Sequence, residues 1–82
     1  MQENKTMKTV NIKFTTIKDV QDFVKIVTRH EGDIDLVSGR YIIDAKSIMG
    51  IFSLDLMNPI QLNAYAEDTS ALMADLEKYI VK

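Results

Sequence analysis

The fold is decided by residues 8–27, KTVNIKFTTIKDVQDFVKIV, where the spacing of the apolar residues changes along the chain. Over residues 8–14 apolar and polar residues alternate, which predicts a strand with one buried face. Beyond Thr16 the apolar residues fall at positions i, i+3, i+4 and i+7, which predicts an amphipathic helix. The apolar face of this helix consists of Val20, Phe23, Val24 and Val27.

Both ends of the predicted helix carry residues that suit them. Thr16 is the expected N-cap, and Asp19, three positions on, completes a loose capping box. Arg29 and His30 match the negative C-terminal end of the helix dipole. Gly32 is the expected stop.

Working outward, a hairpin and a second helix follow. Residues 33–36 alternate, Ser38 and Gly39 favour a turn, and residues 41–43 supply the return strand. A short helix is expected over residues 47–54, with Ser47 as its N-cap. Its apolar stripe, expected to face the core, consists of Ile48, Ile51 and Phe52.

The rest of the chain completes the pattern. Asn58 and Pro59 mark a turn, and the alternation over residues 60–66 predicts a fourth strand. Asp68 is the expected cap of a last helix. The core face of that helix consists of Leu72, Leu76, Tyr79 and Ile80.

The element order βαββαβα predicts an α+β domain. We expect an open-faced β-sandwich with a four-stranded, mainly antiparallel sheet, covered on one face by helices and wet on the other. The 82 residues are expected to form one domain, with residues 1–6 as a flexible N-terminus.

Charge and composition exclude several classes of function. Ten basic and twelve acidic residues are interspersed, so no basic stripe favours nucleic acid. The chain has no cysteine, a single histidine and no glycine-rich phosphate loop, so we expect no metal, no cofactor and no enzyme activity. No apolar run approaches the ~20 residues that cross a bilayer. These features predict a cytoplasmic protein that binds other proteins, not nucleic acid or membrane.

One motif resembles a known family. Residues 46–50, KSIMG, stand at the start of the second predicted helix, and Ile51, Ser53 and Leu54 continue the match. Together with the element order and the length, this run resembles the HPr family, the small phosphocarriers of the bacterial sugar phosphotransferase system. The resemblance covers nearly all of the chain after Met7 and implies the same fold.

The resemblance also implies a lost activity. HPr proteins carry phosphate on a histidine just before the first helix, and the ungapped alignment places that histidine at Thr16. Phosphothreonine is a stable ester that does not pass its phosphoryl group on, and Asp19 adds a negative charge where the family binds an anion. His30 is expected to be solvated at the far end of the helix, where the dipole repels anions. The chain thus resembles a histidine-lacking, Crh-like variant without phosphocarrier chemistry.

The serine of the motif remains. In many HPr proteins a dedicated ATP-dependent kinase phosphorylates this serine, and the product binds a transcriptional regulator. The resemblance therefore implies that Ser47 is a regulatory phosphosite, where a helix N-terminus tolerates the added charge and Lys46 can pair with it. The alternative is that Ser47 only caps its helix, as serine does in proteins of any function.

The expected partner surface lies beside Ser47. Met49 is expected to point outward as adaptable contact surface, or else to pack under the neighbouring loop. The predicted partner-binding residues are Lys46, Ile48, Met49 and Phe52. Two other functions stay open, a phosphocarrier that uses an unexpected residue and a degenerate paralogue with a structural or assembly role. Exposed sheet edges allow either a monomer or a weak homodimer.

Overall fold

The computed structural model describes residues 7–81, and the flexible segment predicted at residues 1–6 lies outside this part. In chain order the elements are β1 (Met7–Ile12), α1 (Ile17–Thr28), β2 (Asp33–Ser38), β3 (Tyr41–Asp44), α2 (Ile48–Phe52), β4 (Ile60–Tyr65), α3 (Ser70–Leu76) and the 3-10 turn η1 (Glu77–Tyr79). This is the predicted order, with η1 added. No helix in the described part of the chain is both long and apolar enough to cross a membrane.

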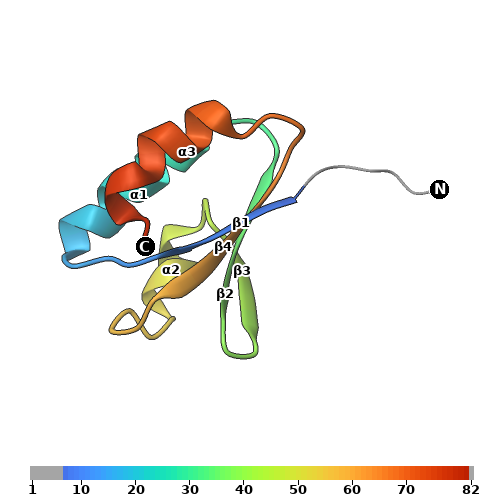
Figure 1. Cartoon of the computed structure of the whole chain (residues 1–82). Helices are drawn as coiled ribbons and strands as arrows, with labels where there is room; N and C mark the ends of the chain where they lie inside the picture. The colour runs from blue at the N-terminus through green and yellow to red at the C-terminus, as the bar shows by residue number, and fades with distance from the viewer. Residues whose placement is uncertain (1–6, 82) are drawn as a thin grey trace.

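The strands form one sheet in the order β1-β4-β2-β3, and every neighbouring pair is antiparallel. Figure 1 shows α1 and α3 lying together against one side of the sheet, and α2 contacts β3. Buried side chains from the helices and from the inner face of the sheet form one core. The predicted α+β open-faced sandwich is confirmed.

Alternation along the strands selects the core face. Ile12, Leu62 and Leu36 are completely buried. Leu62 of β4 lies opposite both Val10 of β1 and Leu36 of β2, so inward side chains of three strands stack in one row. A slip of one residue would turn such a row to solvent, so burial fixes the register.

The first helix, α1, begins as predicted. Thr16 is its N-cap, and the Asp19 side chain completes the capping box by accepting the Thr16 backbone N–H. Val24 of the predicted apolar face is half-buried. The other three residues of that face, all completely buried, are Val20, Phe23 and Val27.

Gly32 does not stop α1, contrary to the prediction. The helix ends at Thr28, with Arg29 as its C-cap. Gly32 instead has a φ of 95°, in the left-handed region that glycine adopts without a steric cost. A Cβ at Gly32 would lie 3.2 Å from the carbonyl oxygen of Tyr65. The glycine therefore lets the chain enter β2 close against β4.

The last helix, α3, has a different cap from the one predicted. Its N-cap is Thr69, whose side chain makes no capping hydrogen bond. The Asp68 carboxylate accepts the Ser70 N–H at 2.9 Å, and this bond lowers the pKa of Asp68. Asp68 thus accepts a backbone N–H of the first turn of α3, although it precedes the N-cap residue by one position. The predicted core face is buried at Leu72, Leu76 and Tyr79 and half-buried at Ile80.

The sheet face opposite the helices carries a polar row with one residue from each strand. The row consists of Thr9, Asn63, Asp35 and Asp44. Asn63 is only 7% exposed, and its side-chain carbonyl oxygen accepts a hydrogen bond from the Thr9 hydroxyl at 2.8 Å. Burial is the main cause that raises the pKa of Asp35, and the charges of Asp44 and Asp33 raise it further.

Replacing Asp35 by asparagine is therefore expected to stabilise the protein at neutral pH. The pKa of Asp35 is higher in the folded protein than in the unfolded chain, so ionisation of Asp35 destabilises the fold. The protein is free of this cost below the unfolded pKa and bears it in full once the pH has risen through the folded pKa. Removing one of two like charges that face each other across strands gains about 0.5 kcal/mol at pH 7.

The measurement is urea unfolding of wild type and Asp35→Asn at pH 7 and at about pH 2.5, where carboxyl groups are mostly protonated. The gain in unfolding free energy should vanish at the acidic pH. Glu67→Gln, an exposed site, supplies the charge-matched control. An equal gain at both pH values would show that the Asp35 charge is not its cause.

Candidate functional site

Ser47 occupies the N-cap position of α2, as predicted. Its backbone is extended, with φ −98° and ψ 101°, and its Oγ accepts the Gly50 N–H at 3.2 Å. A Cβ on Gly50 would lie 3.1 Å from this Oγ and 3.2 Å from Cδ1 of Ile43. Glycine at position 50 therefore leaves room for the cap where α2 meets β3. The Ser47 residue remains exposed to solvent.

Lys46 is not simply a solvated neighbour of Ser47. Its ammonium donates to the carbonyl oxygens of His30 at 2.9 Å and Gly32 at 3.3 Å. Both acceptors belong to the segment between α1 and β2. In the unmodified protein Lys46 thus ties the start of α2 to the end of α1, and any phosphate on Ser47 would compete for a cation that is already engaged.

The exposed side of α2 is apolar. Met49 is 77% exposed and Phe52 is 39% exposed, whereas Ile48 is half-buried against the core. Met49 points outward as predicted, but Phe52 does not face the core. The buried residues of this region are instead Ile51 and Leu54. Phe52 therefore stays in the predicted partner-binding set.

The segment before α1 holds Thr16, the position to which the alignment assigned the phosphocarrier histidine. The Asp19 carboxylate accepts the N–H groups of Thr15 at 2.9 Å and Thr16 at 3.2 Å, and Asp19 N–H donates to Thr16 Oγ1 at 3.1 Å. The bond from Thr15 is the main cause that lowers the pKa of Asp19. Backbone donors that precede the helix are thus taken by a negative side chain of the protein itself.

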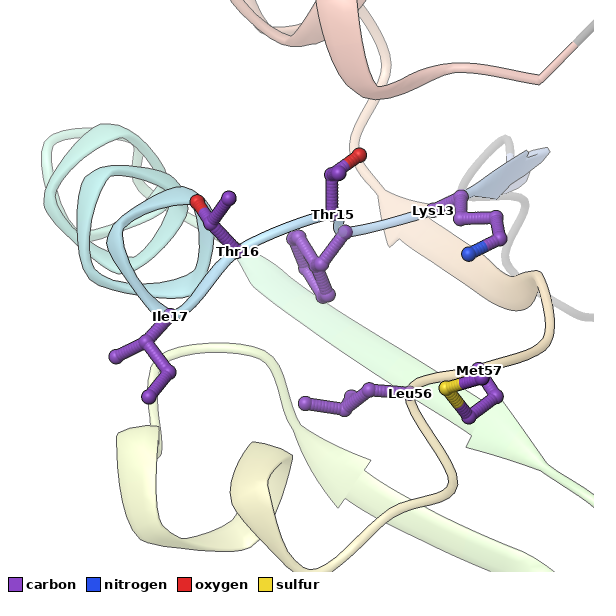
Figure 2. Close-up of a pocket in the computed structure, with 7 residues that line it drawn as sticks. Lys13, Thr15, Thr16, Ile17, Leu56 and Met57 are labelled. Carbon is purple, nitrogen blue, oxygen red and sulfur yellow. The ribbon is translucent and has the colours of Figure 1, made fainter.

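A cavity of about 370 Å³ lies beside this segment. Figure 2 shows residues 13–17 on one side of it and Leu56 and Met57, from the connection between α2 and β4, on the other. Ile17 and Met57 at its edge are 67% and 80% exposed. The complete lining is Lys13, Phe14, Thr15, Thr16, Ile17, Leu56 and Met57.

Sequence periodicity gave a structural role to only some of the residues that line this cavity. Ile17 and Met57 lie outside the predicted apolar faces, and Lys13 reads as the polar side of a strand. An exposed apolar residue at a helix start and another just before Asn58 and Pro59 were the available signals. Their meeting depends on how the chain returns after α2, which local pattern does not specify.

His30, expected to be solvated, is held by another helix. Its side chain is 22% exposed, and Nε2 lies 3.0 Å from Oδ2 of Asp75 in α3. The packing of α3 against α1 brings the two together. His30 lies at the opposite end of α1 from Thr16, so the two do not share a site. Within residues 7–81 no group of three or more histidine, cysteine, aspartate or glutamate side chains could hold a metal ion.

Comparison with known proteins identifies similar structures. No protein-family model matches the chain, and no curated protein matches its sequence. HPr-C-His from Thermoanaerobacter tengcongensis matches with a TM-score of 0.69 and 28% identity, over 89% of this chain and 92% of that one. The phosphocarrier protein HPr from Bacillus anthracis str. Ames matches with a TM-score of 0.71 and 23% identity, over 96% of this chain and 100% of that one. In its fold, the chain is HPr-like.

Proposed function

We propose that this chain is a histidine-lacking, Crh-like variant of the HPr fold that acts by binding other proteins and is switched by phosphorylation of Ser47. The observation that carries the proposal is the exposed Ser47 hydroxyl at the start of α2, beside the exposed side chain of Met49. Phosphorylation adds roughly −1.5 to −2 charges next to this apolar surface. The signal is then a change of surface charge that a partner reads.

The segment before α1 supports the absence of phosphocarrier activity. It contains no histidine, and its hydroxyl groups form phosphate esters too stable for onward transfer. Asp19 already binds the N–H groups of Thr15 and Thr16 with its carboxylate. A phosphoryl group arriving at Thr16 would therefore meet a like charge.

The partners we propose for this chain, which we place in the cytoplasm, are an HPr-type serine kinase and a transcriptional regulator. The partner-binding side chains are Lys46, Ile48, Met49 and Phe52. The free protein is a monomer or weak homodimer, which size-exclusion chromatography with light scattering distinguishes.

Mass spectrometry after treatment with an HPr-type serine kinase and ATP tests this proposal. We expect one phosphate on wild type and none on Ser47→Ala. Ser53→Ala removes another exposed hydroxyl of the same region and should leave labelling unchanged. An authentic HPr labelled in parallel shows that the kinase is active. An unlabelled wild-type chain beside a labelled HPr contradicts the phosphosite and leaves Ser47 as a helix cap.

A phosphocarrier that uses an unexpected residue is the second candidate, favoured by the likeness to HPr structures. Incubation with phosphoenolpyruvate and the first enzyme of the phosphotransferase system separates the two. We expect no acid-labile phosphate on this chain. Transfer of such phosphate would establish the second candidate instead.

A further inference from the structure

Strand β3 lies at one edge of the sheet, and within residues 7–81 it pairs with β2 alone. Figure 1 shows the hairpin of β2 and β3 at the margin of the molecule, directed away from α1 and α3. An edge strand presents unpaired backbone N–H and C=O groups, which are a template for pairing with another chain. The free side of β3 is therefore a surface to which a further strand can add.

The opposite edge, at β1, is partly closed by the end of the described chain. The Val81 N–H donates to the Asn11 carbonyl at 2.8 Å, and a bridge joins Ile12 to Ile80. Proteins commonly protect an exposed edge with lysine, proline or a bulge. β3 contains no lysine and no proline, and its register with β2 is continuous. Of the two edges, β3 is the more open to pairing.

The backbone of Ile42 faces the free side of β3. The Ala45 N–H donates to the carbonyl of Ile34 in β2 at 2.8 Å, so position 45 faces β2. Successive residues of an antiparallel strand direct their backbone groups to opposite sides, so Ile42 and Asp44 face away from β2. The Asp44 carbonyl accepts the Ser47 N–H at 3.0 Å, so pairing along the free edge ends at Asp44.

The side chains of this edge complement a second copy of themselves. Residues 40–44 read RYIID, and Arg40, Ile42 and Asp44 stand at alternate positions. When two copies pair antiparallel about Ile42, the two Ile42 residues lie opposite each other, and Arg40 of each copy lies opposite Asp44 of the other. Opposite charges that face each other across strands stabilise a pair, and so do β-branched apolar side chains.

The apolar side chains of the edge are in solvent in the single chain. Tyr41 is 64% exposed and Ile42 is 67% exposed. An added strand would cover part of this surface, which favours association. Arg40 is exposed too, and the ion pairs found within residues 7–81 do not include it. The edge thus offers apolar surface and a cation together.

Asp44 complements that cation. It lies opposite Asp35 in the β2–β3 register, and like charges that face each other across strands are destabilising. One of its carboxylate oxygens accepts the Lys46 N–H at 2.9 Å, which leaves the other available. An arginine from a second copy would pair with this oxygen and offset the charge of Asp35.

We propose that two copies of this chain associate edge to edge through β3, antiparallel about Ile42, with Arg40 of each copy paired to Asp44 of the other. A second copy is favoured over a foreign strand because the edge complements itself. Stable interfaces bury more than about 1,000 Å², and this contact is short, so the dimer is weak and depends on concentration. The inference goes beyond the proposed function, which leaves monomer and weak homodimer open.

The test combines sedimentation equilibrium with NMR of the ¹⁵N-labelled full chain, from about 0.05 to about 2 mM at low salt, where exposed charges are least screened. We expect the average mass to rise with concentration and the amide signals of residues 40–44 to shift with it. In a mixture of isotope-labelled and unlabelled protein, filtered NOEs should join the Ile42 methyl groups of the two copies.

Ile42→Lys should abolish this association, because a charge at the centre of the edge opposes pairing. Ile17→Lys is the matched control, since Ile17 is also 67% exposed but lies outside the sheet. It should associate as wild type does. The amide spectra report whether each variant is folded.

Charge exchange tests the register. Arg40→Asp leaves only acidic side chains at the two charged positions of the edge, and Asp44→Arg leaves only basic ones. Each variant alone should associate about tenfold more weakly than wild type, since two symmetric ion pairs are replaced by repulsion. Mixed in equal amounts, the two variants should form a heterodimer, because an acidic edge then faces a basic one. Arg40→Lys keeps the charge and should behave like wild type, so Arg40 is tested even if Asp44→Arg does not fold.

Four results would overturn the proposal. The first two are a wild-type chain that stays monomeric at the highest concentration and association that survives Ile42→Lys. The others are equal weakening by Ile42→Lys and Ile17→Lys, and equal association of Arg40→Asp and Arg40→Lys. A mixture of folded charge variants no more associated than each alone would overturn the register. Ser47 is unchanged in every variant, so failure here leaves the kinase test intact.

Discussion

Phe23→Ala is expected to lose about 3–5 kcal/mol of unfolding free energy, the usual cost of emptying a buried phenylalanine site. A domain of 82 residues has a total of roughly 4–12 kcal/mol. The variant should therefore lose between roughly a quarter of its stability and all of it. No other substitution considered for this protein has so large an expected effect on stability.

The reason lies in the position of Phe23. Its side chain is completely buried, and its ring centroid lies 5.0 Å from that of Phe14 and 5.9 Å from that of Tyr79, in edge-on geometry. Phe14 follows β1 and Tyr79 ends η1, so the ring joins α1 to both ends of the described chain. Alanine would remove these contacts together and leave a cavity.

Urea unfolding followed by circular dichroism measures the effect, and Phe52→Ala is the matched control. Phe52 is 39% exposed, so the same truncation should cost no more than about 1 kcal/mol. A loss at Phe23 no greater than that at Phe52 would contradict the core assignment. Phe52→Ala is also expected to keep the fold, so it is suitable for tests of partner binding.

The positions of the strands and helices could be predicted because burial imposes a local period on them. Alternation over β1 and the three-four spacing of α1 each follow from a single buried face. The capping box was visible because Thr16 and Asp19 are close in sequence. These features need only neighbouring residues, so sequence spacing specifies them.

Other features depend on contacts between distant segments. The sequence predicts Gly32 as a helix stop, but its φ of 95° serves the approach of β2 to Tyr65. The sequence predicts a solvated His30, but Asp75 of α3 lies 3.0 Å from it. Asn63 lies on the sheet face opposite the helices, yet it is only 7% exposed and accepts a hydrogen bond from Thr9. The spacing of apolar residues predicts which side of a helix or strand is apolar. It does not predict which residues of other elements pack against either side.

The candidate site likewise has features that local sequence predicts and features that depend on distant segments. Ser47 as a cap and Met49 as an exposed residue follow from the local helix pattern, and the structure agrees. The cavity beside Lys13 joins residues before α1 to residues after α2. The contacts of Lys46 with the segment after α1 were equally hidden, because a lysine next to a serine suggests only a local pair.

Lys46→Met is expected to lose about 2 kcal/mol of unfolding free energy, as for hydrogen bonds that involve a charged group. The ammonium donates to the carbonyl oxygens of His30 and Gly32, and methionine keeps the length of the side chain without the donors. Lys8→Met, at an exposed position, should change stability by no more than about 0.5 kcal/mol. Urea unfolding compares the two, and hydrogen exchange should show faster opening of the amides at the start of β2 in Lys46→Met.

The same variant tests how the proposed phosphorylation of Ser47 would act. A double-mutant cycle measures the cost of Lys46→Met in the unmodified protein and in protein phosphorylated at Ser47. If the phosphate draws the ammonium away from the His30 and Gly32 carbonyls, the two costs should differ, because Lys46 then has a different partner in each state. Equal costs would mean that Lys46 stays on these carbonyls and that phosphorylation acts through surface charge alone. A cost for Lys46→Met no larger than that for Lys8→Met would contradict the contacts themselves, since it would place the Lys46 ammonium in solvent.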